Sequence, residues 1–421
     1  MENRMAGRLG VDPVTGLARA DALHLPLADN SVDLVVTSPP YFALRSYQDG
    51  DEHYDGQIGS EASPQDFLEA LWAATVEMVR VVKPSGSIFV NLGDKYANAG
   101  ASGPPSWDLG PGYTSDVRTA RAVELGHFRP KSLMGLPWRY AIGCIDDLGL
   151  ILRAEMIWSK PNGLPESVTD RVRRSHEQWF HFTLEPRYFT AIDEIRELHS
   201  GGSHSGRLDG ASPPGGRTEK MVASGERGGT IGGTDPAMFN PLGKLPGSVW
   251  SIPAEPLQVP DHLGVDHFAA FPQEWPRRLI LGWCPQEVCS ECGEGRAPVV
   301  DKTPTGRGVT TEERKAQGWA PNRGIATGTQ PMMTFESYTH TITGYACACP
   351  DNSAPSTPGV VLDPFAGTGT VPMVARALGR TGIGIDLSAD YLRLADWRIH
   401  ESGHAAKTIR RTNQERQGSL L

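Results

Sequence analysis

The chain has 421 residues, a length that allows one large domain with insertions or two modest domains. A hydrophobic content of 39% and a charged content of 21% are typical of a soluble globular protein. No apolar run reaches the roughly 18 residues of a membrane span, and the N-terminal stretch lacks the apolar core of a signal peptide. We therefore expect a cytoplasmic protein with no membrane partner. A net charge of −9 argues against a protein that coats nucleic acid nonspecifically, but it allows a DNA enzyme with a local basic surface.

The first strong signal is a strand that ends at two prolines. The run "VDLVV" at 32–36 is typical of a central parallel strand. Pro39 and Pro40 donate no ladder hydrogen bond, and they hold Ser38 extended. Such a turn lies where open α/β sheets bind ligands, and it presents the Ser38 hydroxyl and the Tyr41 ring. An ordinary loop that ends a strand is the alternative.

The next elements alternate in the manner of an α/β protein. An amphipathic helix, "DFLEALWAATVEMVRVVKPSG", should end at Pro84 and Gly86, and a buried strand "SIFVNLGD" should follow. We expect a helix in "SLMGLPWRYAIGCIDDLGL" and strands in "LILRAEMIWSKP" and "EQWFHFTLEP". Between these strands, Arg171, Arg173 and Arg174 are candidate DNA-phosphate ligands. A solvated charged face is the alternative interpretation.

Two segments look like insertions. Residues 196–248 are dominated by glycine, serine, proline and balanced charges, so they predict a flexible insertion and a candidate target-recognition region. Order returns at 249–283, where we expect a helical segment. The second insertion, 284–356, contains five of the six cysteines.

The cysteine pattern of the second insertion predicts a structural zinc site. Cys289 and Cys292 have the usual knuckle spacing, whereas Cys347 and Cys349 form a tighter C-x-C pair. Cys284 and His340 are further candidate ligands, and unligated thiols are the alternative. A cysteine nucleophile is disfavoured. Such a thiolate typically lies in a Pro-Cys motif, whereas Cys284 in "WCPQ" comes before the proline, and Cys144 lies in an apolar helix.

A glycine-rich turn follows in "VVLDPFAGTGTVPMVARALGRTGIGIDLS". The pattern is strand, turn, helix and a second strand that ends at Asp386. Gly367 and Gly369 lie where the backbone must pass close to a ligand. The third glycine of a dinucleotide site is absent, so a nucleoside ligand such as S-adenosylmethionine fits better.

Taken together, "VTSPPY", "DPFAGTGT" and "GIDLSADYLRLADWRI" resemble the beta group of DNA amino-methyltransferases, whose catalytic motif precedes the cofactor motif. The resemblance covers most of the chain outside the insertions. It implies a circularly permuted Rossmann-like α/β fold with a mostly parallel sheet. In this fold, 15–195 would be the catalytic half, 357–403 the S-adenosylmethionine-binding half and 404–421 a basic tail.

The resemblance also implies a role for each matching residue. Ser38 and the Pro39 carbonyl would accept hydrogen bonds from the amino group of a flipped base, Pro40 would keep the turn rigid, and Tyr41 would stack on the base. The implied cofactor pocket consists of Asp21, His267, Phe268, Phe271, Asp363, Phe365, Gly367, Gly369, Thr370 and Asp386. Core packing of the aromatic side chains and a helix cap at Asp21 are the alternatives.

The implied substrate is double-stranded DNA in a prokaryotic or phage-infected cell, with a cognate restriction endonuclease as a candidate partner. Serine before Pro-Pro-Tyr favours cytosine N4 as the methylated atom, and adenine N6 is the alternative. Methyltransferases of RNA or of protein glutamine place their motifs in the opposite order. A DNA-binding protein with a dead site is disfavoured by the intact motifs. The sequence leaves the target site and the oligomeric state open.

Overall fold

The computed structural model describes residues 15–43, 48–49, 52–53, 57–97, 128–163, 165–197, 242–257, 259, 263, 271–306, 337–350 and 353–400. The chain divides into two compact units. The first unit comprises 1–194, 247–297 and 347–421, and the second comprises 195–246 and 298–346. The second unit therefore takes its residues from both predicted insertions.

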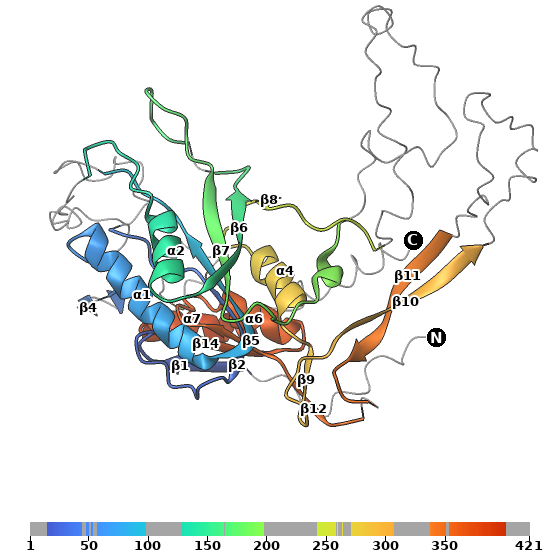
Figure 1. The fold of residues 1–421 in the computed structure, drawn as a ribbon. Coiled ribbons are helices and arrows are strands. Elements are labelled where there is room, and N and C mark those ends of the chain that lie inside the picture. Colours follow the sequence, from blue (N-terminus) through green and yellow to red (C-terminus); the bar gives the residue numbers. More distant parts are fainter. Residues whose placement is uncertain are drawn as a thin grey trace, which may run out of the picture. The chain divides into compact units, whose positions relative to one another are not determined.

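The first unit is built on an eight-stranded, mostly parallel sheet (Figure 1). Within this sheet, β7 pairs antiparallel with both of its neighbours, and the other pairs are parallel. The spatial order is β1 (Thr15–Arg19), β14 (Thr381–Asp386), β13 (Val360–Asp363), β2 (Val32–Thr37), β5 (Val82–Leu92), β7 (His176–Thr183), β6 (Ile151–Ser159) and β8 (Val249–Ser251).

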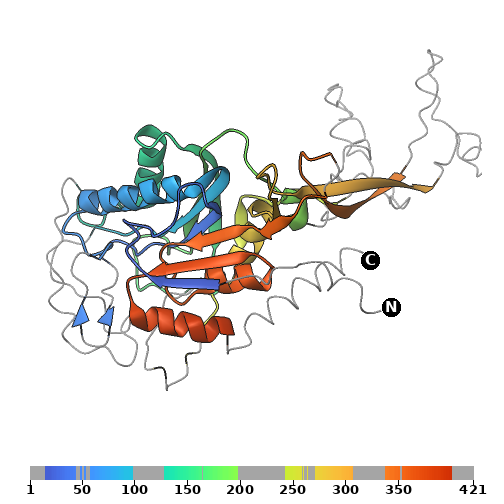
Figure 2. The same ribbon diagram turned by 90° about the horizontal axis from the view of Figure 1, so that it is seen from below.

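Helices cover both faces of this sheet (Figure 2). On one face α1 (Pro64–Val81) packs beside α2 (Leu136–Asp146). The opposite face carries α4 (Glu274–Trp283), α6 (Thr370–Ala377) and α7 (Ala389–His400). The predicted α/β class with a mostly parallel sheet is confirmed, and circular permutation stays a prediction.

Strand β2 lies at the centre of the sheet, as its β-branched run predicted. All six of its residues are buried, because the strand is covered on both faces. It pairs with β13 on one side and β5 on the other, so the first and last parts of the chain meet here. The buried Asp33 carboxylate joins the three strands: it accepts hydrogen bonds from Lys83 Nζ at 2.6 Å and from the Val360 amide at 2.8 Å.

Helix α1 is capped by a side chain at its first turn, and it ends earlier than expected. The Ser63 hydroxyl accepts a hydrogen bond from the Asp66 amide at 3.1 Å. The predicted end at Pro84 and Gly86 is wrong, because the helix ends at Val81 and β5 begins at Val82. Val82 pairs with Val32, and the register of the two strands then shifts, so Pro84 and Gly86 occupy an irregularity of β5.

The remaining elements are short. Within the first unit, β9 (Glu287–Cys289) pairs antiparallel with β12 (Ser356–Pro358), and β3 (Gln48–Asp49) pairs with β4 (Glu52–His53). A 3-10 turn, η2, spans Ile192–Ile195. The second unit contains the two-stranded sheet of β10 (Ala297–Gly306) and β11 (Ser337–Ala346).

Several predictions fall outside the described residues. They concern most of the insertion 196–248, the tail 404–421, His267 and Phe268. In the part of the chain that the structure describes, no helix combines the length and the apolar character that crossing a membrane requires.

Candidate active site

The predicted site residues gather at one edge of the large sheet. Parallel strands end at the same edge, and β7, which runs the other way, begins there. The register places Asn91 of β5 opposite Trp179, and Trp158 of β6 opposite Glu177. The polar side chains at or just beyond this edge are Asp21, Ser38, Asn91, Lys160, Glu177, Asp363 and Asp386.

A hydrogen-bonded group of side chains surrounds the proline turn. The Ser38 Oγ lies 3.2 Å from Asn91 Oδ1 and 3.5 Å from the Tyr41 hydroxyl. The Tyr41 hydroxyl lies 2.8 Å from the same Asn91 oxygen and 2.9 Å from Glu177 Oε2. Asn91 Nδ2 donates to the Gln178 carbonyl at 2.9 Å, which orients the amide so that Oδ1 faces the turn. We call Ser38, Tyr41, Asn91 and Glu177 the turn network.

The Tyr41 hydroxyl has one proton and two acceptors within reach, Asn91 Oδ1 and Glu177 Oε2, so it donates to only one of them at a time. A hydroxyl donates one hydrogen and accepts through its lone pairs. When Tyr41 donates its hydrogen bond to Glu177, the Asn91 oxygen can accept a hydrogen bond from Ser38. The Ser38 oxygen then keeps its lone pairs for an incoming N–H group. Lys160 forms an ion pair with the other Glu177 oxygen and so orients this carboxylate.

The Tyr41 ring lies directly on the backbone at the end of β5. A Cβ atom at Gly93 would come within 2.6 Å of Tyr41 Cε2, so the contact requires glycine at this position. The ring packs against this backbone, and its hydroxyl is hydrogen-bonded within the turn network. Its position is therefore fixed before any ligand arrives.

The next strand end, on β13, is joined to the proline turn by a buried hydrogen bond. Thr37, the last residue of β2, donates from Oγ1 to Asp363 Oδ1 at 2.7 Å. The same carboxylate oxygen accepts from the Phe365 amide at 3.1 Å. Burial raises the pKa of Asp363 to about 7, against the lowering effect of these two hydrogen bonds.

The glycine loop is held by the second acid of its motif. Asp386 accepts from the Gly367 amide at 2.8 Å and from the Ser388 amide at 2.9 Å. Gly367 and Gly369 have φ values of 49° and 71°, a backbone region that favours glycine. A Cβ at Gly369 would also come within 2.6 Å of Ala395 Cβ on α7. The positive φ values and the contact with α7 account for glycine at these positions, and the close approach of a ligand stays a prediction.

A buried arginine supports the glycine loop from α7. Arg398 donates to the Thr368 carbonyl at 2.8 Å and to Thr370 Oγ1 at 2.9 Å, and it also contacts the Thr368 hydroxyl. Burial lowers the pKa of Arg398 to about 10. The Thr370 hydroxyl, predicted to face the cofactor, is thus engaged by Arg398.

Three other predicted cofactor residues make contacts that match the alternatives. Asp21 Oδ1 accepts from the Leu23 amide at 2.9 Å, which is the contact of a local turn or cap. The Phe271 ring packs edge-on against Trp179 with 5.7 Å between centroids. Phe365 is half-buried against the core. None of these contacts uses the full hydrogen-bonding or stacking capacity of these side chains.

The three candidate DNA-binding arginines all make contacts within the protein. Arg171 pairs with Glu166 at 2.7 Å, and its guanidinium lies 3.8 Å from the centre of the Tyr96 ring. Arg173 donates to the Gly163 carbonyl at 2.6 Å, and Arg174 donates to the Asp94 carbonyl. These contacts order the segment, so the role of the three arginines in DNA binding stays a prediction.

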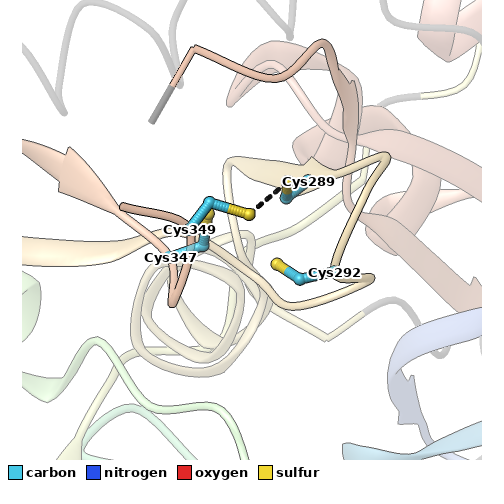
Figure 3. Close-up of side chains that lie close together, drawn as sticks. All are labelled: Cys289, Cys292, Cys347 and Cys349. Carbon is cyan, nitrogen blue, oxygen red and sulfur yellow. Dashed lines mark hydrogen bonds between the residues drawn. The ribbon is translucent and has the colours of Figure 1, made fainter. Parts of the chain in front are cut away.

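The four predicted zinc ligands converge (Figure 3). The sulfur atoms of Cys289, Cys292, Cys347 and Cys349 all lie within 4.8 Å of one another. Cys284 is buried elsewhere, with its sulfur 3.6 Å from the Pro285 carbonyl oxygen, and the side chain of His340 is outside the described residues. The C-x-C pair therefore reaches the same point as the knuckle pair, despite its tighter spacing.

Sequence reasoning missed five side chains of this site: Thr37, Asn91, Lys160, Glu177 and Arg398. One of them carries a visible signal, because Asn91 interrupts the otherwise apolar run "SIFVNL" of a buried strand. An unexplained polar residue there needs a partner. The partners of the others lie far away in the sequence, so no local pattern reveals them.

Comparison with known proteins places most of the chain in one family. A family model described as "DNA methylase" matches residues 32–287 and 353–396. The Type II methyltransferase M.XycI of Xanthomonas campestris pv. cyanopsidis is 43% identical over 190 residues, 44% of this chain and 60% of the relative. M.SmaI of Serratia marcescens is 28% identical over 367 residues, 87% of this chain and 84% of the relative.

A third relative and one solved structure complete the comparison. The Type II methyltransferase M.Cfr9I of Citrobacter freundii is 38% identical over 195 residues, 45% of this chain and 61% of the relative. The match thus spans less than two thirds of M.XycI and of M.Cfr9I. The structure titled PvuII DNA methyltransferase (cytosine-N4-specific) aligns with a TM-score of 0.48 at 14% identity, covering 96% of this chain and 95% of that one.

Proposed function

Because the chain belongs to the DNA methylase family of N4 and N6 amino-methyltransferases, we propose that it methylates a specific site in double-stranded DNA. The methyl donor in this proposal is S-adenosylmethionine, and the acceptor is the exocyclic N4 amino group of cytosine. Methylation of adenine N6 at the same site is the alternative. The relatives named above are Type II methyltransferases, which supports a restriction-modification role and a cognate endonuclease as candidate partner.

The residues at the end of β13 and β14 fit S-adenosylmethionine. The left-handed φ values of Gly367 and Gly369 set the shape of the turn that would hold the cofactor. Asp386 uses its carboxylate for two backbone amides, and a carboxylate has about four acceptor positions, so it can still accept from ribose hydroxyls. Asp21, at the end of β1, is a candidate acceptor for the adenine amino group. When bound, S-adenosylmethionine supplies an electrophilic methyl group on its sulfonium.

Ser38 is the residue that activates the acceptor in this proposal. An exocyclic amino nitrogen is a poor nucleophile because its lone pair is delocalised into the ring. The Ser38 oxygen and the Pro39 carbonyl would accept its two hydrogens and favour a tetrahedral nitrogen with a free lone pair. The nitrogen would then bond to the methyl carbon while the bond between that carbon and the cofactor sulfur breaks and leaves a neutral thioether, and the methylated amine would release one proton to water. The prolines hold both acceptors in place before the base arrives.

The observation that carries this proposal is the turn network itself. A serine hydroxyl can accept from the target amino group only when its own proton points elsewhere. Asn91 Oδ1, at 3.2 Å from Ser38 Oγ, provides that other acceptor. Its orientation is set by the Gln178 carbonyl, which belongs to the sheet rather than to the turn.

Cytosine is favoured as the target because Ser38 is neutral. A carboxylate at this position would polarise the less acidic amino group of adenine more strongly than a hydroxyl does. Tyr41 supports either base, because stacking on an aromatic ring is tolerant of base identity and is worth roughly 1–3 kcal/mol. The flipped base would lie between this ring and the methyl donor.

Two regions are proposed to bind the rest of the DNA. Arg171, Arg173 and Arg174 would contact backbone phosphates, and 196–248 would recognise the target sequence. Deleting 203–240 should then abolish site-specific methylation and leave cofactor binding within a few-fold. A deletion variant that methylates the same site would exclude this segment from recognition.

The experiment that tests the proposed function is transfer of labelled methyl groups to plasmid DNA, RNA and protein in parallel. We expect incorporation into DNA only, and we expect Ser38→Ala to abolish most of it. The methylated DNA is then digested and its nucleosides are identified by mass spectrometry. N4-methyldeoxycytidine supports the proposal. N6-methyldeoxyadenosine alone would contradict the assigned base, and label in RNA or protein alone would contradict the substrate class.

A further inference from the structure

The cysteine cluster has the geometry of a tetrathiolate metal site. A tetrahedral Zn²⁺ with Zn–S bonds of about 2.3 Å separates its sulfur ligands by about 3.8 Å. The Cys289 and Cys349 sulfur atoms lie 3.8 Å apart, and all four sulfurs lie within 4.8 Å of one another. A disulfide would require about 2.05 Å, and none of these four cysteines forms one in the structure.

The backbone around Cys289 has the form of a metal-binding knuckle. The Gly293 amide donates to the Cys289 carbonyl at 3.0 Å, and Gly293 has a φ of 73°. The amides of Cys292 and Glu291 form hydrogen bonds to the Cys289 sulfur. Amides that point at a sulfur stabilise it as a thiolate, which is the form that binds a metal.

The surroundings of the cluster balance the charge of such a site. A zinc ion with four thiolates carries a net charge of about −2, so a nearby cation is expected beyond the ligands. Arg296 forms a hydrogen bond to Cys347 and also contacts Glu287 and the Ala354 carbonyl. The guanidinium thus links one metal ligand to Glu287 of β9 and to Ala354, two residues before β12.

We propose that Cys289, Cys292, Cys347 and Cys349 bind one structural Zn²⁺ that ties together the two ends of the 293–346 excursion. Cys292 lies shortly before the chain leaves the first unit after Ala297, and Cys347 is the residue at which it returns. The cluster also adjoins β12, where Ser356 pairs with Cys289, and β12 leads directly into β13 and the glycine loop.

This position gives the metal a mechanical role rather than a catalytic one. No other residue type with metal-binding character joins the four sulfurs among the described residues, so the coordination is complete and leaves no open position for water. A closed site of this kind stabilises the fold of the surrounding chain. Here it would keep β9 and β12 paired although residues 298–346, which lie between them in the sequence, belong to the second unit.

The test uses the full-length protein purified without chelators. We expect about one tightly bound zinc ion per chain by elemental analysis. Replacing zinc with Co²⁺ should give the intense visible absorption of tetrahedral thiolate-bound cobalt. Cys292→Ser and Cys349→Ser should lose most of the metal. Cys144→Ser and Cys284→Ser are matched controls, because both residues are buried cysteines outside the cluster, and these variants should keep it.

Two results would overturn the proposal. One is a wild-type chain that binds zinc far below one equivalent and shows no cobalt thiolate absorption. The other is full metal retention in both Cys292→Ser and Cys349→Ser. The wild-type measurements do not depend on the folding of any variant, and they do not depend on whether the chain methylates DNA. A disulfide found between these cysteines under reducing conditions would also contradict the proposal.

Discussion

The proline turn and the glycine loop are neighbours in the sheet, but they are stabilised in different ways. The side chains that hold Ser38 and Tyr41 come from other strands: Asn91 lies on β5 and Glu177 on β7, and Lys160, directly after β6, pairs with Glu177. The glycine loop is held mainly by backbone amides that donate to Asp363 and Asp386, only a few residues away or on the adjacent strand.

This difference predicts which single substitutions should change the rate of methyl transfer and which should change affinity for the cofactor. A side-chain network at the turn sets the direction of one proton, so losing one member changes the reaction step. A loop held by amides sets the shape of a binding surface, so losing its acid changes affinity for the cofactor. The Thr37 to Asp363 hydrogen bond couples the two regions.

The largest expected effect is on the turn side, at Ser38. Ser38→Ala removes the acceptor that faces the base, and removal of one preorganised partner typically costs on the order of 10²–10³ in rate. Single-turnover methyl transfer should fall by this factor, whereas S-adenosylmethionine affinity should stay within a few-fold. A variant that instead loses cofactor binding by titration would show that Ser38 belongs to the loop side of the site.

On the loop side, Asp386→Ala should raise the dissociation constant of S-adenosylmethionine by about 10- to 100-fold. Hydrogen bonds to a charged group contribute about 1.5–3 kcal/mol each, and this carboxylate orients Gly367 as well as the ribose. Isothermal titration with Asp386→Asn as the conservative variant checks this value. Unchanged affinity in Asp386→Ala would remove the residue from the cofactor site.

A smaller effect is expected at Asn91, which acts through Ser38 and does not touch the base. Asn91→Leu should lower the single-turnover rate by about tenfold, the cost of one misdirected neutral hydrogen bond of about 1.4 kcal/mol. Asn91→Asp keeps oxygen acceptors in place and should retain more activity. Circular dichroism and cofactor binding control for folding. Equal losses in both variants would argue for a purely structural role.

The last effect concerns the coupling between the two regions, and it changes stability with pH rather than the rate of methyl transfer. Because the folded-state pKa of Asp363 is raised to about 7, the folded protein binds this proton more tightly than the unfolded chain does. The contribution of Asp363 to stability is therefore full below the unfolded pKa near 4 and is lost as the pH rises towards about 7.

The matched variant for this pH effect is Asp363→Asn, which does not titrate. Between about pH 4 and pH 7 the wild type should lose up to about 1.4 kcal/mol of unfolding free energy per pH unit relative to the variant. Urea unfolding across this range measures the difference. A constant difference over the whole range would show that Asp363 does not titrate there.

The same contrast explains how far the sequence alone could predict this site. The glycine loop and each of the two cysteine pairs were predictable, because each is defined by residues a few positions apart, and Asp386 was predictable as the end of the strand that follows the loop helix. Asn91, Glu177 and Lys160 were not, because their proximity to Ser38 depends on the order of β2, β5, β7 and β6 in the sheet. The early end of α1 was missed because Val82 continues the amphipathic pattern of the helix, yet in the structure it pairs with Val32 of β2 as the first residue of β5.

The central claim is that Asn91 Oδ1 accepts a hydrogen bond from the Ser38 hydroxyl, so that the Ser38 oxygen can accept one from the target amino group. A double-mutant cycle on the single-turnover methyl-transfer rate tests it most directly. We predict that Asn91→Leu lowers the rate in the wild-type background but has little further effect in the Ser38→Ala background. If Asn91→Leu lowers the rate by the same factor in both backgrounds, the two residues act independently and the claim is contradicted.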